Sequence, residues 1–261
     1  MSVLNVESIR GRITKNSGAH LDLLEVFSGI ESTNSYLMAQ PRPPVGCFRV
    51  AIAEHQTAGR GRLDRTWQSP PSSGLYMSMS YSFAKIPENL PPLTLAVGIG
   101  IAKAMGELDI RGIGLKWPND IIACDGKVGG ILTEVMPGKS ETVSVVVGLG
   151  LNIDLHSAKQ ELNLRGPLEK ATDLRCCAER LPDWSAMSAT IIDGLFNTLV
   201  RFDADGFRPF FETWPQFDWL RGQRVVVEVA DGQVEGLVQG IEDDGALVVG
   251  GERVYSGSVS R

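Results

Sequence analysis

A change in hydrophobic periodicity marks the middle of the chain, where a strand pattern gives way to a helix pattern. From Leu75 to Ser82, one set of alternate residues is apolar and the other is mostly serine. This alternation predicts a strand that is buried on one face. From Pro92 to Met105, apolar residues recur three and four positions apart. That spacing predicts a helix with one apolar stripe.

Further apolar runs predict a mixed sheet backed by helices, which is an α+β or α/β-type fold. Ser32 or Thr33 can cap a helix after the first strand, and the Pro41–Pro44 stretch ends that helix. The other predicted strands and helices follow from apolar runs bounded by glycine, proline and small polar residues. Predicted strands are Leu21–Phe27, Arg49–Glu54, Ile113–Trp117, Val128–Val135 and Thr142–Leu149, and predicted helices are Asp183–Phe202 and the short aromatic Phe207–Phe217.

The residue pattern of the chain changes near Trp219, and this change predicts a separate C-terminal module. Arg224–Ala230 is rich in β-branched residues, and Asp231-Gly232 and Asp244-Gly245 are typical of hairpin turns. Short strands joined by tight turns predict a small β-barrel. Because so short a module has a small hydrophobic core, we expect its stability to depend on contacts with the larger domain. The predicted domains are residues 1–218 and 219–261.

Composition and charge narrow the possible functions. The chain is 43% hydrophobic and 21% charged, as in a folded globular protein. Its net charge of −6 argues against a nucleic-acid-binding protein. No apolar run is long enough to span a bilayer, and the N-terminus has no apolar signal-peptide core. We therefore predict a cytoplasmic protein with no membrane association.

The cysteines and histidines give no sequence signal for a metal site. Cys47, Cys124, Cys176 and Cys177 contain no C-x-x-C pair, so we expect reduced thiols. The three histidines are far apart in the sequence and lack the spacing of metal ligands.

The Gly59-Arg60-Gly61-Arg62 segment carries the clearest chemical signal. Its glycines let the backbone approach a ligand, and its arginines suit a carboxylate or a phosphate. Trp67 follows and offers a flat face for a ring. Alone, the segment could equally be a surface turn with solvated arginines.

Other polar motifs stand at the ends of predicted strands. Lys116–Asp120 places an amide and a carboxylate after a strand that Pro118 stops, a position that suits Mg²⁺ or a simple proline turn. Lys127 precedes paired glycines, which indicate close approach of a ligand or another strand. Gly148–Asn152 ends another strand in the same way. Helix capping is the simpler explanation for Ser32-Thr33-Asn34, and solvent exposure is the simpler one for Gln56.

Taken together and in order, these segments resemble the catalytic domain of biotin–protein ligases. The resemblance covers nearly all of the chain from about Leu24 onward. The C-terminal stretch from Gly240 to Leu247, together with Ser256-Gly257, resembles that family's SH3-like domain. The segments of the catalytic domain are Glu31–Asn34, Gln56–Trp67, Lys116–Asp120, Lys127–Leu132 and Gly148–Asn152.

The resemblance implies a two-step reaction that uses ATP, biotin and Mg²⁺. Biotin's carboxylate attacks the α-phosphorus of ATP to form biotinyl-5′-AMP and pyrophosphate. A lysine of a biotin carboxyl carrier domain, in an acyl-CoA or pyruvate carboxylase, then takes the biotin and AMP leaves.

The resemblance also implies a role for each motif residue. Lys127 and Arg62 are the expected catalytic residues, and they act by stabilising charge. Asp120 is the expected Mg²⁺ ligand. The expected biotin-binding residues are Ser32, Thr33, Asn34, Gln56, Arg60, Gly61, Arg62 and Lys127, and the expected ATP-binding residues are Arg60, Arg62, Trp67, Asn119, Asp120 and Asn152.

Two positions depart from the family pattern. The loop usually reads G-R-G-R-x-G, but Asp64 stands in the last position. Ser258 follows Ser256-Gly257 where glutamate is often found. We expect Asp64 to affect loop order or retention of the adenylate without abolishing activity. Because the loop is rich in glycine, we expect it to become ordered only when ligand binds.

Three alternatives remain at this stage. A lipoate–protein ligase has a related fold, but the Gly-Arg-Gly-Arg loop speaks against it. A non-catalytic biotin-binding protein would have no use for Lys127 or the Asn119–Asp120 pair. A DNA-binding repressor would need a winged helix, and the stretch before Leu23 is too short for one. We expect a monomer or a weak homodimer.

Overall fold

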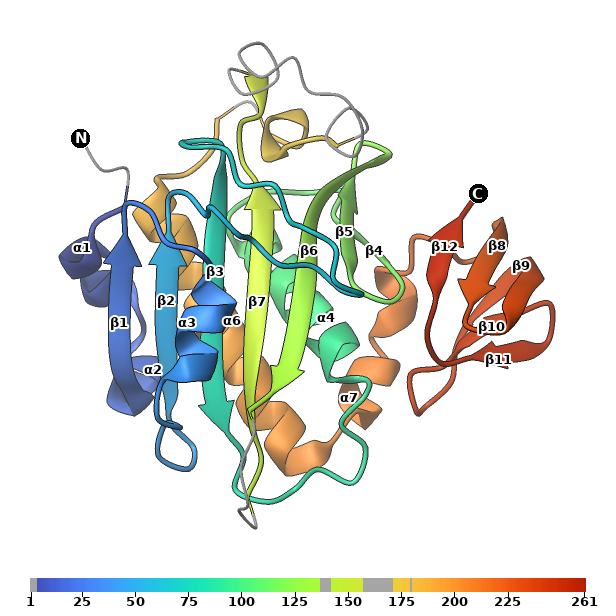
Figure 1. Cartoon of the computed structure of the whole chain (residues 1–261), viewed down its shortest axis with the longest axis horizontal. Helices are drawn as coiled ribbons and strands as arrows, with labels where there is room; N and C mark the ends of the chain where they lie inside the picture. Colours follow the sequence, from blue (N-terminus) through green and yellow to red (C-terminus); the bar gives the residue numbers. More distant parts are fainter. Residues whose placement is uncertain (1–3, 137–141, 157–170, 179) are drawn as a thin grey trace.

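The larger part of the molecule is built on a seven-stranded mixed sheet (Figure 1). The computed structural model describes residues 4–136, 142–156, 171–178 and 180–261. The strand order is β1-β2-β3-β7-β6-β5-β4, with β1 and β2 parallel and every other neighbouring pair antiparallel. The strands are β1 (Leu21–Phe27), β2 (Phe48–Ala53), β3 (Gly74–Ser82), β4 (Gly114–Lys116), β5 (Asp120–Ala123), β6 (Gly126–Val135) and β7 (Ser144–Asn152).

Helices cover both faces of this sheet, and the predicted mixed sheet backed by helices is confirmed. Helix α3 lies on one face, in front of β2, β3 and β7, whereas α4 and α6 cover the other face (Figure 1). Ser32 caps α3 by accepting a hydrogen bond from the Ser35 N–H, 3.3 Å away, as its sequence position predicted. The helices are α1 (Val6–Arg12), α2 (Lys15–His20), α3 (Thr33–Ala39), α4 (Leu93–Glu107), α6 (Trp184–Asp205) and α7 (Arg208–Phe211), with 3₁₀ turns η1 (Leu174–Cys176) and η2 (Trp214–Gln216).

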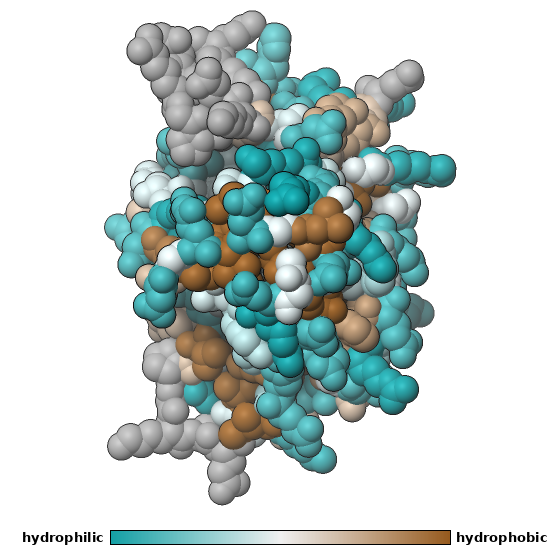
Figure 2. All heavy atoms as spheres, turned by 90° about the vertical axis from the view of Figure 1, so that its right-hand side faces the viewer, coloured by the Kyte–Doolittle hydropathy of each residue, from teal (hydrophilic) through white to brown (hydrophobic). Residues whose placement is uncertain are grey.

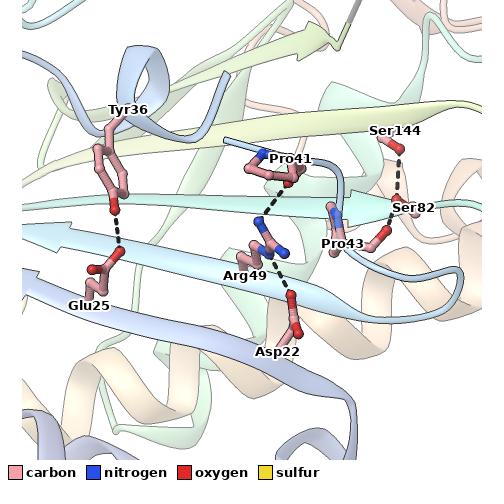
Figure 3. A network of polar contacts seen from close by, with 8 residues as sticks. All are labelled: Asp22, Glu25, Tyr36, Pro41, Pro43, Arg49, Ser82 and Ser144. Carbon is pink, nitrogen blue, oxygen red and sulfur yellow. Dashed lines mark hydrogen bonds and ion pairs between the residues drawn. The ribbon is translucent and has the colours of Figure 1, made fainter. Parts of the chain in front are cut away.

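Strand β3 is buried on both faces, so the prediction of a half-buried strand was wrong. Its serines look polar in the sequence, but the Ser78 and Ser82 hydroxyls have hydrogen-bond partners within the fold. Ser78 donates to Asn34 Oδ1 at 2.6 Å. Ser82 donates to the Pro43 carbonyl and also contacts the Ser144 hydroxyl, each at 2.7 Å (Figure 3). Because a hydrogen-bonded serine is buried at little cost, alternation did not reveal the second covered face.

Helix α4 is buried almost all round, which corrects the single apolar stripe predicted for it. One side of α4 meets the sheet, and α6 covers the opposite side. Small residues on α4 look neutral to a periodicity analysis, yet they let the two helices approach closely. Sequence patterning also missed α1, α2 and the short strand β5, because these elements have few apolar residues or lie beside a tight turn.

The C-terminal strands form an antiparallel sheet of five, in agreement with the predicted SH3-like module. The order is β11-β10-β9-β8-β12, and Figure 2 shows hydrophobic residues gathered among hydrophilic ones on the side of the molecule nearest this sheet. Leu237 and Tyr255 are exposed large hydrophobic residues of this module. The strands are β8 (Arg224–Val229), β9 (Gly232–Ile241), β10 (Leu247–Val249), β11 (Glu252–Val254) and β12 (Ser258–Ser260).

The small sheet is attached to the edge of the large one, which agrees with its expected dependence on the larger domain. The Leu115 amide of β4 donates to the Phe217 carbonyl at 2.7 Å, and the Leu115 carbonyl accepts from the Trp219 amide at 3.0 Å. The Trp117 indole donates to the Gly245 carbonyl at 3.0 Å. The boundary at residue 219 stays a prediction.

The close contact of α4 with α6 predicts a position-specific response to alanine. A Cβ added at Gly100 would lie 2.1 Å from the Thr198 hydroxyl, whereas one added at Gly106 would meet no atom within 4 Å. Gly100→Ala should therefore destabilise the fold by about 1–3 kcal/mol through overpacking. Gly106→Ala, in the same helix, should be neutral or stabilising. Urea unfolding of both variants checks this, and equal unfolding free energies would contradict the packing described.

Candidate functional site

One cavity of about 610 Å³ collects every residue that the sequence analysis proposed for a site. Its walls come from the start of α3, the loop between β2 and β3, strands β5 to β7 and the C-terminal module. The residues that line it include Ser32, Thr33, Asn34, Gln56, Arg60, Gly61, Arg62, Trp67, Asn119, Asp120, Lys127 and Asn152. Their individual roles in binding stay predictions.

A buried network of hydroxyl and amide groups forms one side of the cavity. Gln56 accepts the Thr33 backbone N–H at 2.8 Å through Oε1. The Thr33 hydroxyl contacts Ser78 Oγ at 2.7 Å, and Ser78 donates to Asn34 Oδ1. The Gln56 amide donates to Ser69 Oγ at 3.2 Å. These side chains hold one another in position, so the start of α3 presents fixed polar groups to the cavity and is more than a helix cap.

Glycines in β6 and β7 make the floor of the cavity. A Cβ at Gly148 would lie 2.2 Å from Asn34 Oδ1, and a Cβ at Gly150 would lie 2.5 Å from Trp67 Cε2. A Cβ at Gly129 would lie 2.8 Å from the Gly150 carbonyl. The prediction of close approach at these glycines is confirmed, and the approaching groups are the neighbouring strand and two side chains of the site.

Trp67 lies over this glycine floor, beside Lys127. Its ring centroid is 5.3 Å from Lys127 Nζ, a distance that permits a cation–π interaction. Its indole Nε1 is buried and makes no hydrogen bond within the described part of the chain. This nitrogen lies against Gly150, where an added Cβ would be 2.6 Å from it.

The loop that contains the two arginines forms a closed turn anchored to the sheet. The Gly61 N–H donates to the Arg65 carbonyl at 2.7 Å. Arg60 makes two parallel contacts with the Glu134 carboxylate of β6, at 2.8 and 3.0 Å. Glu134 also accepts the Asn34 amide at 3.0 Å, so one carboxylate joins the loop to α3.

Asp64 occupies a left-handed backbone position in this loop. Its φ is 57°, and that of Leu63 is 54°. Glycine adopts this conformation without cost, and aspartate tolerates it better than most residues do. The geometry therefore explains both why glycine suits this position and how aspartate can replace it.

The remaining wall of the cavity is strongly cationic, although the chain as a whole is acidic. Among the residues that the structure describes, five basic side chains and one carboxylate line the cavity: Arg60, Arg62, Arg65, Lys116 and Lys127 against Asp120. Such a cavity attracts a polyanion. The prediction that an anion binds here thus gains a local electrostatic basis that the net charge of −6 concealed.

Polar contacts hold two of these basic side chains in position, and burial lowers the pKa of two of them. Lys127 Nζ lies 2.6 Å from Asp120 Oδ1, and Arg62 donates to Asn119 Oδ1 at 3.2 Å. Burial lowers the pKa of Arg62, while the nearby Asp120 charge opposes this shift. Burial likewise lowers the pKa of Lys116, and Asp120 again opposes it. Asp120 therefore pairs with Lys127 and raises the pKa values of Arg62 and Lys116 against the effect of burial.

The structure adds residues that sequence reasoning did not assign to the site. Lys116 belonged to a recognised motif, and Ser78 to the polar face of β3. Glu134 had no sequence signal, because a strand carboxylate usually faces water. The small sheet also reaches the cavity through Gly257, Ser258 and Val259, so the residue that departs from the family pattern, Ser258, lies at the site itself.

Asn152 already has a structural partner, because its side-chain amide donates to the Thr172 carbonyl at 3.1 Å.

Comparison with known proteins gives matches over both parts of the chain. Residues 27–152 match the biotin/lipoate A/B protein ligase family, and residues 221–261 match the biotin protein ligase C-terminal domain. The biotin–[acetyl-CoA-carboxylase] ligase of Mycobacterium tuberculosis is 30% identical over 259 residues, covering 96% of this chain and 92% of that protein. The bifunctional ligase/repressor BirA of Escherichia coli is 29% identical over 255 residues, covering 95% of this chain and 74% of that protein.

A solved structure supports the same fold. The biotin protein ligase of Aquifex aeolicus, determined in complex with biotin and ATP, superposes with a TM-score of 0.74. The match covers 92% of this chain and 98% of that one, at 24% sequence identity.

The Arg60–Glu134 pair predicts how firmly the arginine loop is held. Glu134→Gln removes the charge that Arg60 contacts and should loosen the loop by about 0.5–1 kcal/mol. Trypsin can report this change directly, because the loop contains Arg60, Arg62 and Arg65. Cleavage there should become roughly 2–5-fold faster. Glu235→Gln, which breaks an exposed pair with Arg224 in the small sheet, is the matched control. Unchanged cleavage in Glu134→Gln would contradict the anchoring role.

Proposed function

We infer the function from the premise that this chain belongs to the biotin/lipoate A/B protein ligase family. It is a biotin–protein ligase, which activates biotin with ATP to biotinyl-5′-AMP and transfers the biotin to a lysine of an acceptor protein. One observation of the structure carries the mechanism: a single cavity joins a buried amide–hydroxyl network to a wall of five basic side chains. A ligand with a small polar ring can therefore lie at one end of the cavity, with a polyanion beside it at the other end.

The amide–hydroxyl side suits the ureido ring of biotin. A buried ureido group needs partners for its carbonyl and both N–H groups, otherwise it would bind weakly. Thr33, Asn34, Gln56 and Ser32 supply both donors and acceptors at this end. Met77, Ile131 and Leu149 line the cavity nearby and offer apolar surface for the rest of the molecule.

The cationic side carries out the adenylation step by stabilising charge. The biotin carboxylate approaches the α-phosphate of ATP, and the two negative groups repel each other. Lys127 and Arg62 offset that repulsion and stabilise the charge that develops on the phosphate oxygens. The carboxylate oxygen forms a bond to the α-phosphorus while the bond to pyrophosphate breaks. Neither side chain acts as the nucleophile.

Mg²⁺ fits this site as an ion held mainly by ATP. Asp120 is a carboxylate that lines the cavity, and Mg²⁺ commonly binds one carboxylate together with phosphates and waters. Asp120 already pairs with Lys127, so it would be shared between the two cations. The ion would supply further neutralisation of the phosphate charges.

The arginine loop and Trp67 protect the mixed anhydride before transfer. An acyl-adenylate hydrolyses in water, so it must be covered until the acceptor arrives. Trp67 offers its face to the adenine, and the loop from Arg60 to Thr66 lies over the phosphate region. In the second step the acceptor lysine amine attacks the biotinyl carbonyl, and AMP leaves.

The finer assignments are part of this proposal. The acceptor is the biotin carboxyl carrier domain of an acyl-CoA or pyruvate carboxylase. The chain acts in the cytoplasm as a monomer or a weak homodimer, without binding DNA. No helix in the described part of the chain is long and apolar enough to cross a membrane.

Exchange of labelled pyrophosphate into ATP tests the proposed reaction without an acceptor. With purified protein and Mg²⁺, biotin should support exchange and lipoate should not, because the cavity's polar end matches a ureido group and not a dithiolane. Exchange with lipoate alone, or with neither acid in folded protein, would overturn the assignment.

Lys127→Ala should slow biotin-dependent exchange by more than about tenfold, which corresponds to ~1.4 kcal/mol of lost transition-state stabilisation. Lys103→Ala is the control, since Lys103 is exposed on α4, away from the cavity. A normal exchange rate in Lys127→Ala would mean that the reacting groups lie elsewhere.

Arg62→Ala should speed the escape of biotinyl-5′-AMP, because it removes a half-buried cation of the cavity wall and a hydrogen bond to Asn119. The measurement is release of labelled adenylate from the protein, with Arg111→Ala as the exposed control. Equal release from both variants would count against this role.

A further inference from the structure

Three cysteine thiols that are distant in the sequence meet on the surface outside the cavity. The sulfur atoms of Cys124, Cys176 and Cys177 all lie within 4.8 Å of one another. Cys176 Sγ and Cys177 Sγ are 3.5 Å apart, and the Cys124 thiol donates to the Cys176 carbonyl at 3.2 Å. No local motif predicts this group, because Cys124 and Cys176 are 52 positions apart in the sequence.

The two segments that carry these thiols are held together by other contacts. The Thr172 N–H donates to the Lys127 carbonyl at 3.0 Å, next to the β5–β6 turn. A Cβ at Gly126 would lie 2.8 Å from the Thr172 side chain, so the segments touch. Asp173 caps the η1 turn by accepting from the Arg175 N–H at 3.1 Å. The thiols are therefore brought together by a frame that does not depend on them.

Cys124 occupies a position in which a cysteine is unusual. Cys124 and Asp125 form the two-residue turn between β5 and β6, with φ of 48° and 59°. Turns with both central residues in the left-handed region favour asparagine, aspartate or glycine. Cys124 therefore adopts a backbone conformation that cysteine disfavours, and its side chain lies beside those of Cys176 and Cys177.

We propose that Cys124, Cys176 and Cys177 form a binding site for a soft divalent cation, with Zn²⁺ as the best match. Thiolates are preferred ligands of Zn²⁺, with a Zn–S distance of about 2.3 Å. Three sulfurs already within 4.8 Å can reach one such ion by small side-chain rotations. Binding releases the thiol protons to solvent, so no oxidant or reductant is needed. Because Cys124 and Cys176 are exposed, water can take the fourth position.

A metal ion bound here would link the β5–β6 hairpin to the segment around η1, and both segments border the cavity. The β5–β6 hairpin that Cys124 closes also contains Asp120, and Lys127 lies just beyond its turn. The second segment begins at Ala171, which pairs with Lys127 and lines the cavity. The bound ion links these two segments and raises their stability. This inference concerns the ion site alone and does not rest on the proposed reaction.

Titration of the reduced full-length protein with Cd²⁺ tests the site, because thiolate-to-Cd²⁺ charge transfer gives an ultraviolet absorption band. The expected result is one equivalent bound, with displacement by Zn²⁺ and a rise in Tm for either ion. Cys124→Asn suits the left-handed turn, so the protein should fold, yet the variant should bind at least about tenfold more weakly. Cys177→Ser is a second variant with the same expected loss.

Cys47→Ser is the matched control, because Cys47 is a free cysteine outside the group. It should bind Cd²⁺ as the unmodified protein does. Several outcomes would overturn the proposal: no stoichiometric band, equal affinity in Cys124→Asn, or a loss caused by Cys47→Ser. A protein that forms a disulfide within the group and binds no metal when reduced would also overturn it, and would identify a redox pair instead.

Discussion

The close approach of two side chains to the backbone of β7 is the constraint on which the rest of the site depends. Asn34 and Trp67 occupy the space above Gly148 and Gly150 that any larger residue would fill. Asn34 brings the start of α3 to the sheet, and Trp67 brings the end of the arginine loop. Because both approach neighbouring positions on one strand, the polar network and the cationic wall share a single cavity.

Electrostatics then decides how that cavity can hold a polyanion. Cations placed near one another repel, and burying them costs free energy unless partners are present. Asp120 and Glu134 provide these partners: one pairs with Lys127, and the other with Arg60. The cations are thus held in position, while their number still exceeds that of the carboxylates. A phosphate that enters the cavity meets donors already in place, which lowers the reorganisation needed during reaction.

The small C-terminal sheet contributes to the site as well as to the overall architecture. Its segment from Gly257 to Val259 lines the cavity, and Gly245 accepts a hydrogen bond from Trp117, which also lines it. Arg261, at the end of the chain, lies over the Trp219 ring at 3.5 Å. The position of the small sheet therefore affects the same wall that holds Lys116 and Asp120.

The sequence by itself determined the strands and helices with clear periodicity and the residue types of the site. Alternation located β3, apolar residues three and four positions apart located α4, and the Gly-Arg loop with its neighbouring motifs identified the family. These signals are local, since they depend on which side chains stand a few positions apart. The twelve site residues named from these motifs all line one cavity, although the motifs alone did not show how they meet.

Only the tertiary structure decided which groups meet across the chain. It showed that the polar face of β3 is covered, that Glu134 anchors Arg60 and that Asp120 pairs with Lys127. It also brought Cys124 to Cys176 and Cys177. These contacts join residues whose separation in the sequence bears no relation to their distance in space. Strand order and helix packing determine such distances, and neither can be read from local periodicity.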